Sequence, residues 1–166
     1  TAAGLAAAGK IPFASTFAVF ATGRVYDQIR NSVAYSGLNV KIAGSHSGIT
    51  VGEDGASHQA LEDIALMRSL PGMTILVPAD APEAYRATLA AASWEGPVYL
   101  RLGRPKVPEL FFSDVLFQIG RGILLKRGND ICLVSTGSMT PLALEANKIL
   151  SAQKIYSSVI HLPPIK

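Results

Sequence analysis

Thr74-Ile-Leu-Val-Pro-Ala-Asp80-Ala-Pro-Glu83 joins a short apolar run to the start of a helix. The run at residues 74–77 is apolar and rich in β-branched residues, as buried strands are. Asp80 predicts a helix N-cap, with Pro82 in the first turn and Glu83 placed to complete a capping box. A second apolar run, Val98-Tyr-Leu-Arg-Leu102, follows after a helix-length segment. Strand, helix and strand in succession predict a parallel sheet flanked by helices.

The same alternation continues toward the N-terminus. Residues 39–43 form another strand-like run. Two sets of apolar residues have helical spacing: Val25, Ile29 and Val33, and then Leu61, Ile64 and Ala65. Residues 1–8 are rich in alanine and have no N-cap before them, so we expect them to be the end of a helix that begins upstream. The predicted fold of residues 1–115 is therefore α/β.

A second unit is predicted after a break at residues 105–112, which contain two prolines and no clear period. Residues 123–125 and 130–134 are strand-like on either side of a turn, and residues 158–162 form a further strand. Between them, Thr140 is a candidate N-cap with Pro141 at the first helical position. We place the boundary near residue 115. Residues 116–166 are too few to close a core alone, so we expect an incomplete second α/β domain and a chain that is a fragment at both ends.

Composition excludes several classes of protein. Of the 166 residues, 49% are hydrophobic but only 16% are charged, which is low for a soluble domain and predicts a surface covered by another chain. A net charge of +3 is too small for a general nucleic-acid binder, and no apolar run is long enough to span a membrane. The N-terminus lacks the pattern of a signal peptide, and the single Cys132 excludes an internal disulfide. We therefore expect a cytoplasmic protein.

The densest set of polar residues is Gly44-Ser-His46-Ser-Gly-Ile-Thr-Val-Gly52-Glu-Asp54-Gly-Ala-Ser57-His58-Gln59. It lies between a predicted strand and a predicted helix, where open α/β sheets bind their ligands. Glycines allow the backbone to approach a ligand, and histidines titrate near neutral pH. The alternative is a flexible surface loop in which Ser57 caps a helix.

Three other places are candidates for chemistry. Phe17 and Phe20 share a face if their segment is helical, as an aromatic platform for a planar ring or as ordinary core. We expect Arg101 to be a solvated surface arginine, with an anion anchor at the strand end as the alternative, and strand alternation puts Arg104 on the opposite face. The turn at residues 135–138 is best explained as structural, because no phosphate-binding glycine motif follows a strand. Glu53 and Asp54 do not form a metal-ligand pattern, so no metal site is predicted in this chain.

Together, four stretches resemble transketolase, and more narrowly its pyrimidine-binding domain as found in the C-terminal subunit of split transketolases. They are Phe13-Ala-Ser-Thr-Phe17-Ala-Val-Phe20, residues 46–59, Met67-Arg-Ser-Leu-Pro-Gly-Met73 and Arg101-Leu-Gly-Arg104. The resemblance covers residues 1–115. Residues 116–166, including Thr136-Gly-Ser138, resemble the beginning of the transketolase C-terminal domain. The resemblance to transketolase implies a thiamine-diphosphate-binding fold.

The resemblance also implies an activity: transfer of a two-carbon ketol group from a ketose phosphate to an aldose phosphate, in the pentose phosphate pathway. Phe20 matches the residue that stacks on the aminopyrimidine ring, and Phe17 lies beside it. His58 and Asp54 match residues that contact the sugar hydroxyls at the reacting carbons, where His58 also moves protons. His46 and Arg104 match the pair that holds the distal phosphate of the substrate.

The chain departs from the family pattern in four ways. Ser47 stands where single-chain transketolases often have an acidic residue, and Gly23 stands where they often have a third aromatic. The family's catalytic glutamate lies upstream of the matched segment. The motif that binds diphosphate and Mg²⁺ or Ca²⁺ belongs to an N-terminal partner domain. The resemblance therefore implies a fragment that is inactive alone and a subunit that works in a dimer or heterotetramer with an N-terminal transketolase subunit.

Three alternatives remain open. Deoxyxylulose-phosphate synthase uses the same cofactor with pyruvate as donor, but His46-Ser-Gly-Ile-Thr50 matches the transketolase phosphate site better. The β-subunit of a ketoacid dehydrogenase is disfavoured by residues 52–59. A non-catalytic transketolase-like scaffold would differ in lacking the upstream glutamate.

Overall fold

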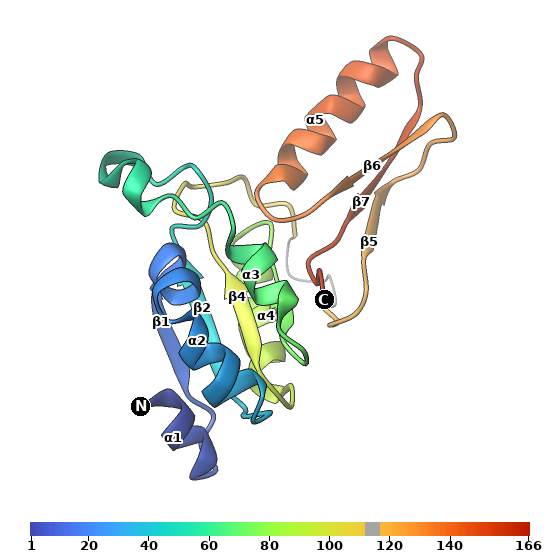
Figure 1. Ribbon diagram of the computed structural model, residues 1–166. Coiled ribbons are helices and arrows are strands. Elements are labelled where there is room, and N and C mark those ends of the chain that lie inside the picture. Colours follow the sequence, from blue (N-terminus) through green and yellow to red (C-terminus); the bar gives the residue numbers. More distant parts are fainter. Residues whose placement is uncertain (112–116) are drawn as a thin grey trace.

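A computed structural model describes residues 1–111 and 117–166. The first unit is built on a sheet of four strands, β1 (Phe13–Phe17), β2 (Lys41–Ser45), β3 (Thr74–Leu76) and β4 (Val98–Arg101). All are parallel, in the order β1-β2-β4-β3 (Figure 1). The predicted α/β class with a helix-flanked parallel sheet is confirmed.

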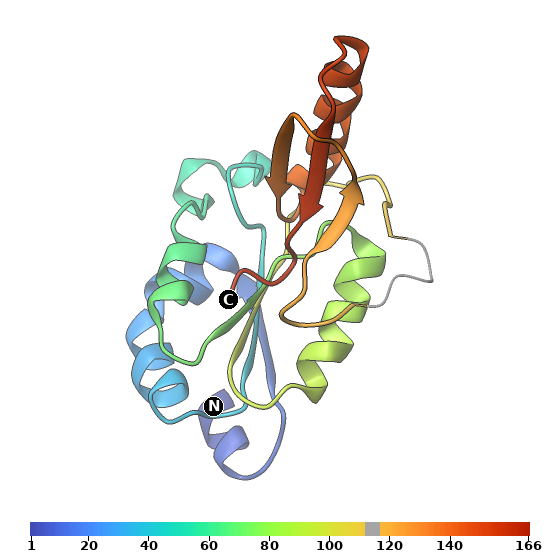
Figure 2. The same ribbon diagram turned by 90° about the vertical axis from the view of Figure 1, so that its right-hand side faces the viewer.

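Helices cover both faces of this sheet (Figure 2). One face carries α2 (Tyr26–Ile29), the π-helical segments η1 (Phe20–Arg24) and η2 (Arg30–Ala34) on either side of it, and α3 (Asp63–Ser69). The other face carries α4 (Ala81–Ser93), and α1 (Ala2–Ala7) precedes β1. Because successive side chains of a strand point to opposite faces of the sheet, the core is divided into one cluster on each face. Tyr99 packs in the cluster under α3, whereas its neighbours Val98 and Leu100 pack with Ala87 and Ala91 of α4.

The N-terminus of α4 has the predicted cap. The side chain of Asp80 accepts a hydrogen bond from the amide of Glu83 at 2.8 Å, and Glu83 accepts in return from the amide of Ala79 at 2.7 Å. The same Asp80 carboxylate also accepts from the amides of Leu110 and Phe111, which ties the segment after β4 to this helix.

Two interpretations of the first unit are corrected by the structure. The condition that Phe17 and Phe20 lie on one helix is not met, because Phe17 ends the edge strand β1 and Phe20 begins η1. Leu61 is 67% exposed and precedes α3, which begins only at Asp63, because residues 46–62 form a long excursion from the sheet.

The second unit has three strands and one long helix. β5 (Ile123–Lys126) pairs antiparallel with β7 (Ser157–His161), which pairs in parallel with β6 (Ile131–Ser135). Helix α5 (Met139–Ala152) has Ser138 as its N-cap rather than the predicted Thr140, whose hydroxyl bonds instead with the ring of His161. The predicted boundary near residue 115 lies outside the described residues.

The chain after β7 returns to the first unit (Figure 2). Residues 163–166 run antiparallel beside β3, with the amide of Val77 donating to Pro163 and that of Ile75 donating to Lys166. Over residues 1–111 and 117–166, no helix is long and apolar enough to cross a bilayer.

Candidate functional site

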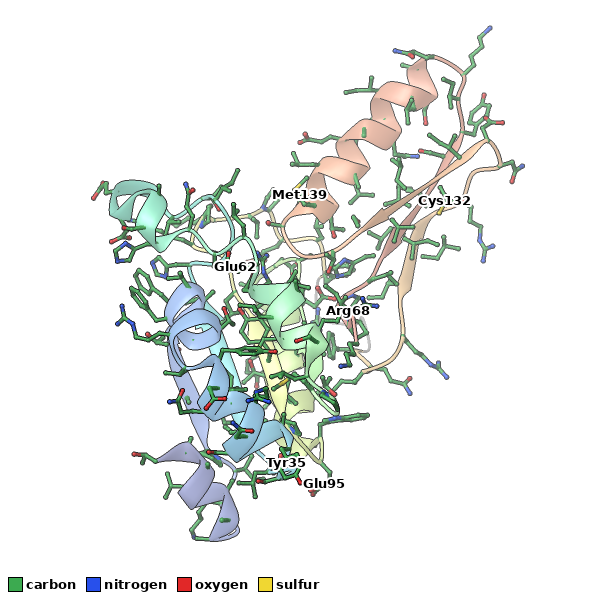
Figure 3. The ribbon with its side chains drawn as sticks, in the orientation of Figure 1. Tyr35, Glu62, Arg68, Glu95, Cys132 and Met139 are labelled. Atoms are coloured by element: carbon green, nitrogen blue, oxygen red, sulfur yellow. The ribbon has the colours of Figure 1, made fainter. Side chains whose placement is uncertain are left out.

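The carboxyl ends of β1, β2 and β4 meet at one edge of the sheet, which is where ligands bind in open α/β folds. Phe17 is in register with Ser45, and Gly44 with Arg101, so the residues that follow these strands are neighbours. Residues 46–62 leave the sheet at this edge (Figure 1). Tyr35 and Glu95 lie at the opposite edge (Figure 3).

His46 follows β2 in a left-handed backbone conformation, with φ of 54°. This conformation costs a non-glycine residue about 1–2 kcal/mol and persists only where the surroundings impose it. It turns the imidazole back onto β1, where it stacks on Phe17 with centroids 3.9 Å apart and planes 13° apart. Nδ1 of the ring lies 3.1 Å from the hydroxyl of Ser45.

Phe17 and Phe20 form an aromatic platform despite lying in different elements. Their centroids are 6.0 Å apart and their planes differ by 13°, and both side chains are half-buried. Phe20 opens η1, and π-helical turns occur frequently at functional sites. The guanidinium of Arg24 lies 4.6 Å from the centroid of Phe20.

His58 completes this group. Its ring is edge-on to both phenylalanines, 6.0 Å from Phe17 and 5.2 Å from Phe20. Nδ1 lies 3.0 Å from the hydroxyl of Ser57, which therefore bonds His58 and does not cap a helix. We call Phe17, Phe20, His46 and His58 the aromatic cluster.

Asp54, on the same loop, meets Arg104, which follows β4, at a separate place. Nη1 of Arg104 lies 3.6 Å from Oδ2 of Asp54 and also donates to the carbonyl of Val51. Both side chains are more than a third exposed, so this ion pair contributes little to stability and both charges can turn to a ligand. The structure thus joins Arg104 to Asp54, and His46 to Phe17; a joint phosphate grip by His46 and Arg104 stays a prediction.

The prediction that Arg101 is a solvated surface residue is wrong. Its side chain is 19% exposed, and its Nε donates to the fully buried carboxylate of Asp63 at 2.7 Å. The hydroxyl of Tyr99 donates to the same oxygen at 2.8 Å. Burial, and then the neighbouring Asp63 charge, raise the pKa of Tyr99 above its usual range.

Sequence reasoning missed Asp63, although two signals were present. Tyr99 and Arg101 are two positions apart on one strand and so share a face. An acid at the start of an otherwise apolar helix face needs a partner when that face is buried.

A cavity of about 360 Å³ lies away from this edge, between α1, β1, α2 and the segments beside α2. Its lining is mainly apolar, with Thr1, Ser15, Thr16, Gln28 and Ser32 as polar members, and it includes no residue of the aromatic cluster. Because no titratable side chain lines it, the chemistry is placed at the carboxyl edge instead.

Comparison with known families agrees with this geometry. Residues 1–109 match the model of the transketolase pyrimidine binding domain, and residues 120–166 match that of the transketolase C-terminal domain. The chain belongs to the transketolase family. Among curated relatives it is 45% identical to a putative transketolase C-terminal section of Methanocaldococcus jannaschii, over 99% of this chain and 53% of the relative.

Other relatives extend the comparison. A 6-deoxy-6-sulfo-D-fructose transketolase subunit of Clostridium sp. is 42% identical over 99% of this chain and 51% of its own length. A solved structure described as a split gene transketolase, inactive beta4 tetramer, superposes with a TM-score of 0.90 and 55% identity, over 98% of this chain and 52% of that one. This transketolase-family chain spans about half the length of the curated relatives it matches.

Proposed function

We propose that this chain is the pyrimidine-binding part of a split transketolase, which transfers a two-carbon ketol group from a ketose phosphate to an aldose phosphate with thiamine diphosphate. The observation that carries the proposal is the aromatic cluster at the carboxyl edge of the sheet in a member of this family. The transketolase family generally depends on thiamine diphosphate.

The residues present fit the pyrimidine half of that cofactor. Phe17 and Phe20 offer half-buried, nearly parallel rings, which suit stacking against a flat heterocycle. When bound, the cofactor supplies the electron sink for cleavage of a carbon–carbon bond. The described residues contain no cluster of three or more His, Cys, Asp or Glu side chains that could hold a metal ion. We assign Mg²⁺ or Ca²⁺ and the diphosphate to an N-terminal partner subunit, because the resemblance to transketolases implies that their binding motif belongs to that domain.

The remaining site residues would hold the sugar phosphate. Nδ1 of His58 is occupied by Ser57, which leaves Nε2 to bond a substrate hydroxyl and to move a proton during cleavage and addition. Asp54 lies on the same loop and would bond a neighbouring hydroxyl. Arg104 and His46 would hold the distal phosphate, and a remote anchor of this kind helps to position the reacting carbons.

Assembly with a partner follows from the same reasoning. The similar solved structure is described as a split gene transketolase, inactive beta4 tetramer. This description supports a requirement for a second kind of subunit. The low charged fraction of 16% fits a large covered surface. We propose a dimer or heterotetramer in the cytoplasm. Two relatives are named for 6-deoxy-6-sulfo-D-fructose and apulose 4-phosphate, so the preferred sugar is part of the test.

The test uses the full-length subunit that contains this chain, with a candidate N-terminal partner, thiamine diphosphate and Mg²⁺. Two reactions are run in parallel: xylulose 5-phosphate with ribose 5-phosphate, and pyruvate with glyceraldehyde 3-phosphate. We expect turnover of the first pair, loss of that turnover in His58→Ala, and retention in Tyr35→Ala, which changes a 90% exposed residue at the far edge. Turnover of the second pair alone would assign the protein to the deoxyxylulose-phosphate synthases, and turnover of neither would indicate a scaffold.

A further inference from the structure

The loop of residues 46–62 is closed by a narrow neck. Gly48 and Ala60 exchange two backbone hydrogen bonds, of 3.0 and 3.2 Å, and the side chain of Gln59 donates to the carbonyl of Ile49 at 3.1 Å. His58 directly precedes Gln59 on the exit side of this neck. The position of its imidazole against Phe20 therefore depends on how the neck is held.

The end of β4 holds both sides of the neck. On the entry side, Leu102 accepts hydrogen bonds from the amide and the hydroxyl of Ser47, at 3.1 and 3.0 Å. On the exit side, Arg101 holds Asp63 by two nitrogens, Nε to Oδ2 at 2.7 Å and Nη2 to Oδ1 at 3.3 Å. A bidentate contact of this kind fixes orientation as well as distance.

Close packing leaves this arrangement little freedom. A Cβ on Gly48 would lie 3.5 Å from Nη2 of Arg101, so the guanidinium is directly against the neck. A Cβ on Gly44 would lie only 2.6 Å from the hydroxyl of Tyr99, which is itself bonded to Asp63. The buried carboxylate of Asp63 is thus connected to the neck on one side and to the sheet on the other.

We propose that Asp63 and Arg101 are positioning residues, whose buried ion pair fixes the neck so that His58 is held edge-on to Phe17 and Phe20. Its kinetic consequence rests on the proposed ketol transfer; its structural consequence does not. Arg101 acts through His58 and does not bind the substrate phosphate itself, because two of its three guanidinium nitrogens are bonded to Asp63.

Two variants of the full-length subunit test the proposal. Asp63→Asn keeps the size of the side chain and removes its charge, and Arg101→Lys keeps a charge but loses the planar two-nitrogen contact. The matched control is Asp27→Asn, which removes an ion pair with Arg30 whose two side chains are more than half exposed.

The first measurement is hydrogen exchange, which needs no activity. In Asp63→Asn we expect the amides of Gly48 and Ala60 to exchange about tenfold faster or more, while the amide of Val98, bonded to Val40 within the sheet, keeps its protection. Unchanged exchange at Gly48 and Ala60 in a folded variant would overturn the proposal. Equal acceleration at Val98 would also overturn it, since the pair would then be a general stabiliser of the fold. Should Asp63→Asn not fold, the same criteria apply to Arg101→Lys.

The second measurement is kinetic and uses the complex with the N-terminal subunit. We expect kcat to fall about tenfold to a hundredfold in Asp63→Asn, with KM for the sugar phosphate nearly unchanged, because an error of about 1 Å at a catalytic group costs this much. In Arg101→Lys, kcat should fall less than in Asp63→Asn, because the lysine keeps the charge. In Asp27→Asn, kcat and KM should match those of the parent. A raised KM with unchanged kcat would overturn the proposal in favour of direct phosphate binding. If the parent complex transfers no ketol group while the neck amides respond as expected, the proposed function fails and the positioning of the neck stands.

Discussion

The contact between Glu83 and His161 offers the sharpest test of how the two units are joined. His161 of β7 is fully buried, and its Nε2 lies 2.8 Å from Oε2 of Glu83 in α4. Nδ1 lies 2.8 Å from the hydroxyl of Thr140, which in turn is 3.2 Å from that of Ser135. With the imidazole in its Nε2–H tautomer every contact is satisfied: Ser135 donates to Thr140, Thr140 donates to Nδ1, and Nε2–H donates to Glu83.

Replacing His161 by alanine should therefore lower the free energy of unfolding by about 3 kcal/mol. Removing one member of a buried pair typically costs about 3–5 kcal/mol, because the other is left without its partner. We expect the lower end of this range, since Glu83 still accepts from the amide of Ala79 at 2.7 Å at the N-terminus of α4. Glu83→Gln should cost less, about 1 kcal/mol, because it leaves no buried charge.

The assay is urea unfolding, followed by circular dichroism for the whole chain and by the fluorescence of Trp94 for the first unit. Glu145→Gln on the exposed face of α5 is the matched control and should change stability by less than about 0.5 kcal/mol. The double variant of Glu83→Gln and His161→Ala should cost less than the sum of the single variants, because the two groups interact directly. A loss below about 0.5 kcal/mol in His161→Ala, or strict additivity in the double variant, would refute this account of the junction.

Three further predictions concern the first unit. Burial lowers the pKa of Lys41 to about 8, against an opposing effect of Glu95. Because the unfolded lysine keeps its proton up to about pH 10.5, stability should rise by about 1 kcal/mol from pH 8 to 9.5 in urea titrations, and a flat profile would contradict the pKa. Gly44→Ala should lower stability by about 1–3 kcal/mol, measured as a drop in Tm, because the new Cβ meets the buried Tyr99; Gly4→Ala, with open space around it, should cause no drop. His46→Gly should relieve backbone strain and raise stability by up to about 1 kcal/mol, yet raise KM for the sugar phosphate; equal KM values in parent and variant would remove His46 from the phosphate site.

Local signals predicted much of the first unit. The cap of α4 follows from Asp80 and Glu83, which are three residues apart and bond each other whatever surrounds them. The strands β3 and β4 follow from short apolar runs, and the loop at the carboxyl edge follows from its glycines and histidines. Edge strand β1 escaped prediction because its exposed and half-buried residues lack the apolar alternation of a half-buried strand.

The candidate site, too, could be predicted only in part from the sequence. The residue types of the aromatic cluster could be named from the sequence, but not that His46 stacks on Phe17, since this depends on a left-handed turn that a histidine adopts only under constraint. Arg101 was misjudged because its partner Asp63 is 38 positions away. The sequence signals that a buried Asp63 needs a partner, but no periodicity identifies Arg101 as that partner.

The sequence by itself determined the class of fold, the order of its elements and the loop that carries the polar residues, because these depend on interactions between residues a few positions apart. Tertiary structure alone decided which charged side chains pair with each other inside the protein and which stay accessible to a ligand. Arg101 is bound by Asp63 and His161 meets Glu83 from 78 positions away, whereas Arg104 and His58 stay accessible at the carboxyl edge. The physical reason is that a buried charge must find a partner wherever folding brings one close, and that partner is chosen by packing in three dimensions.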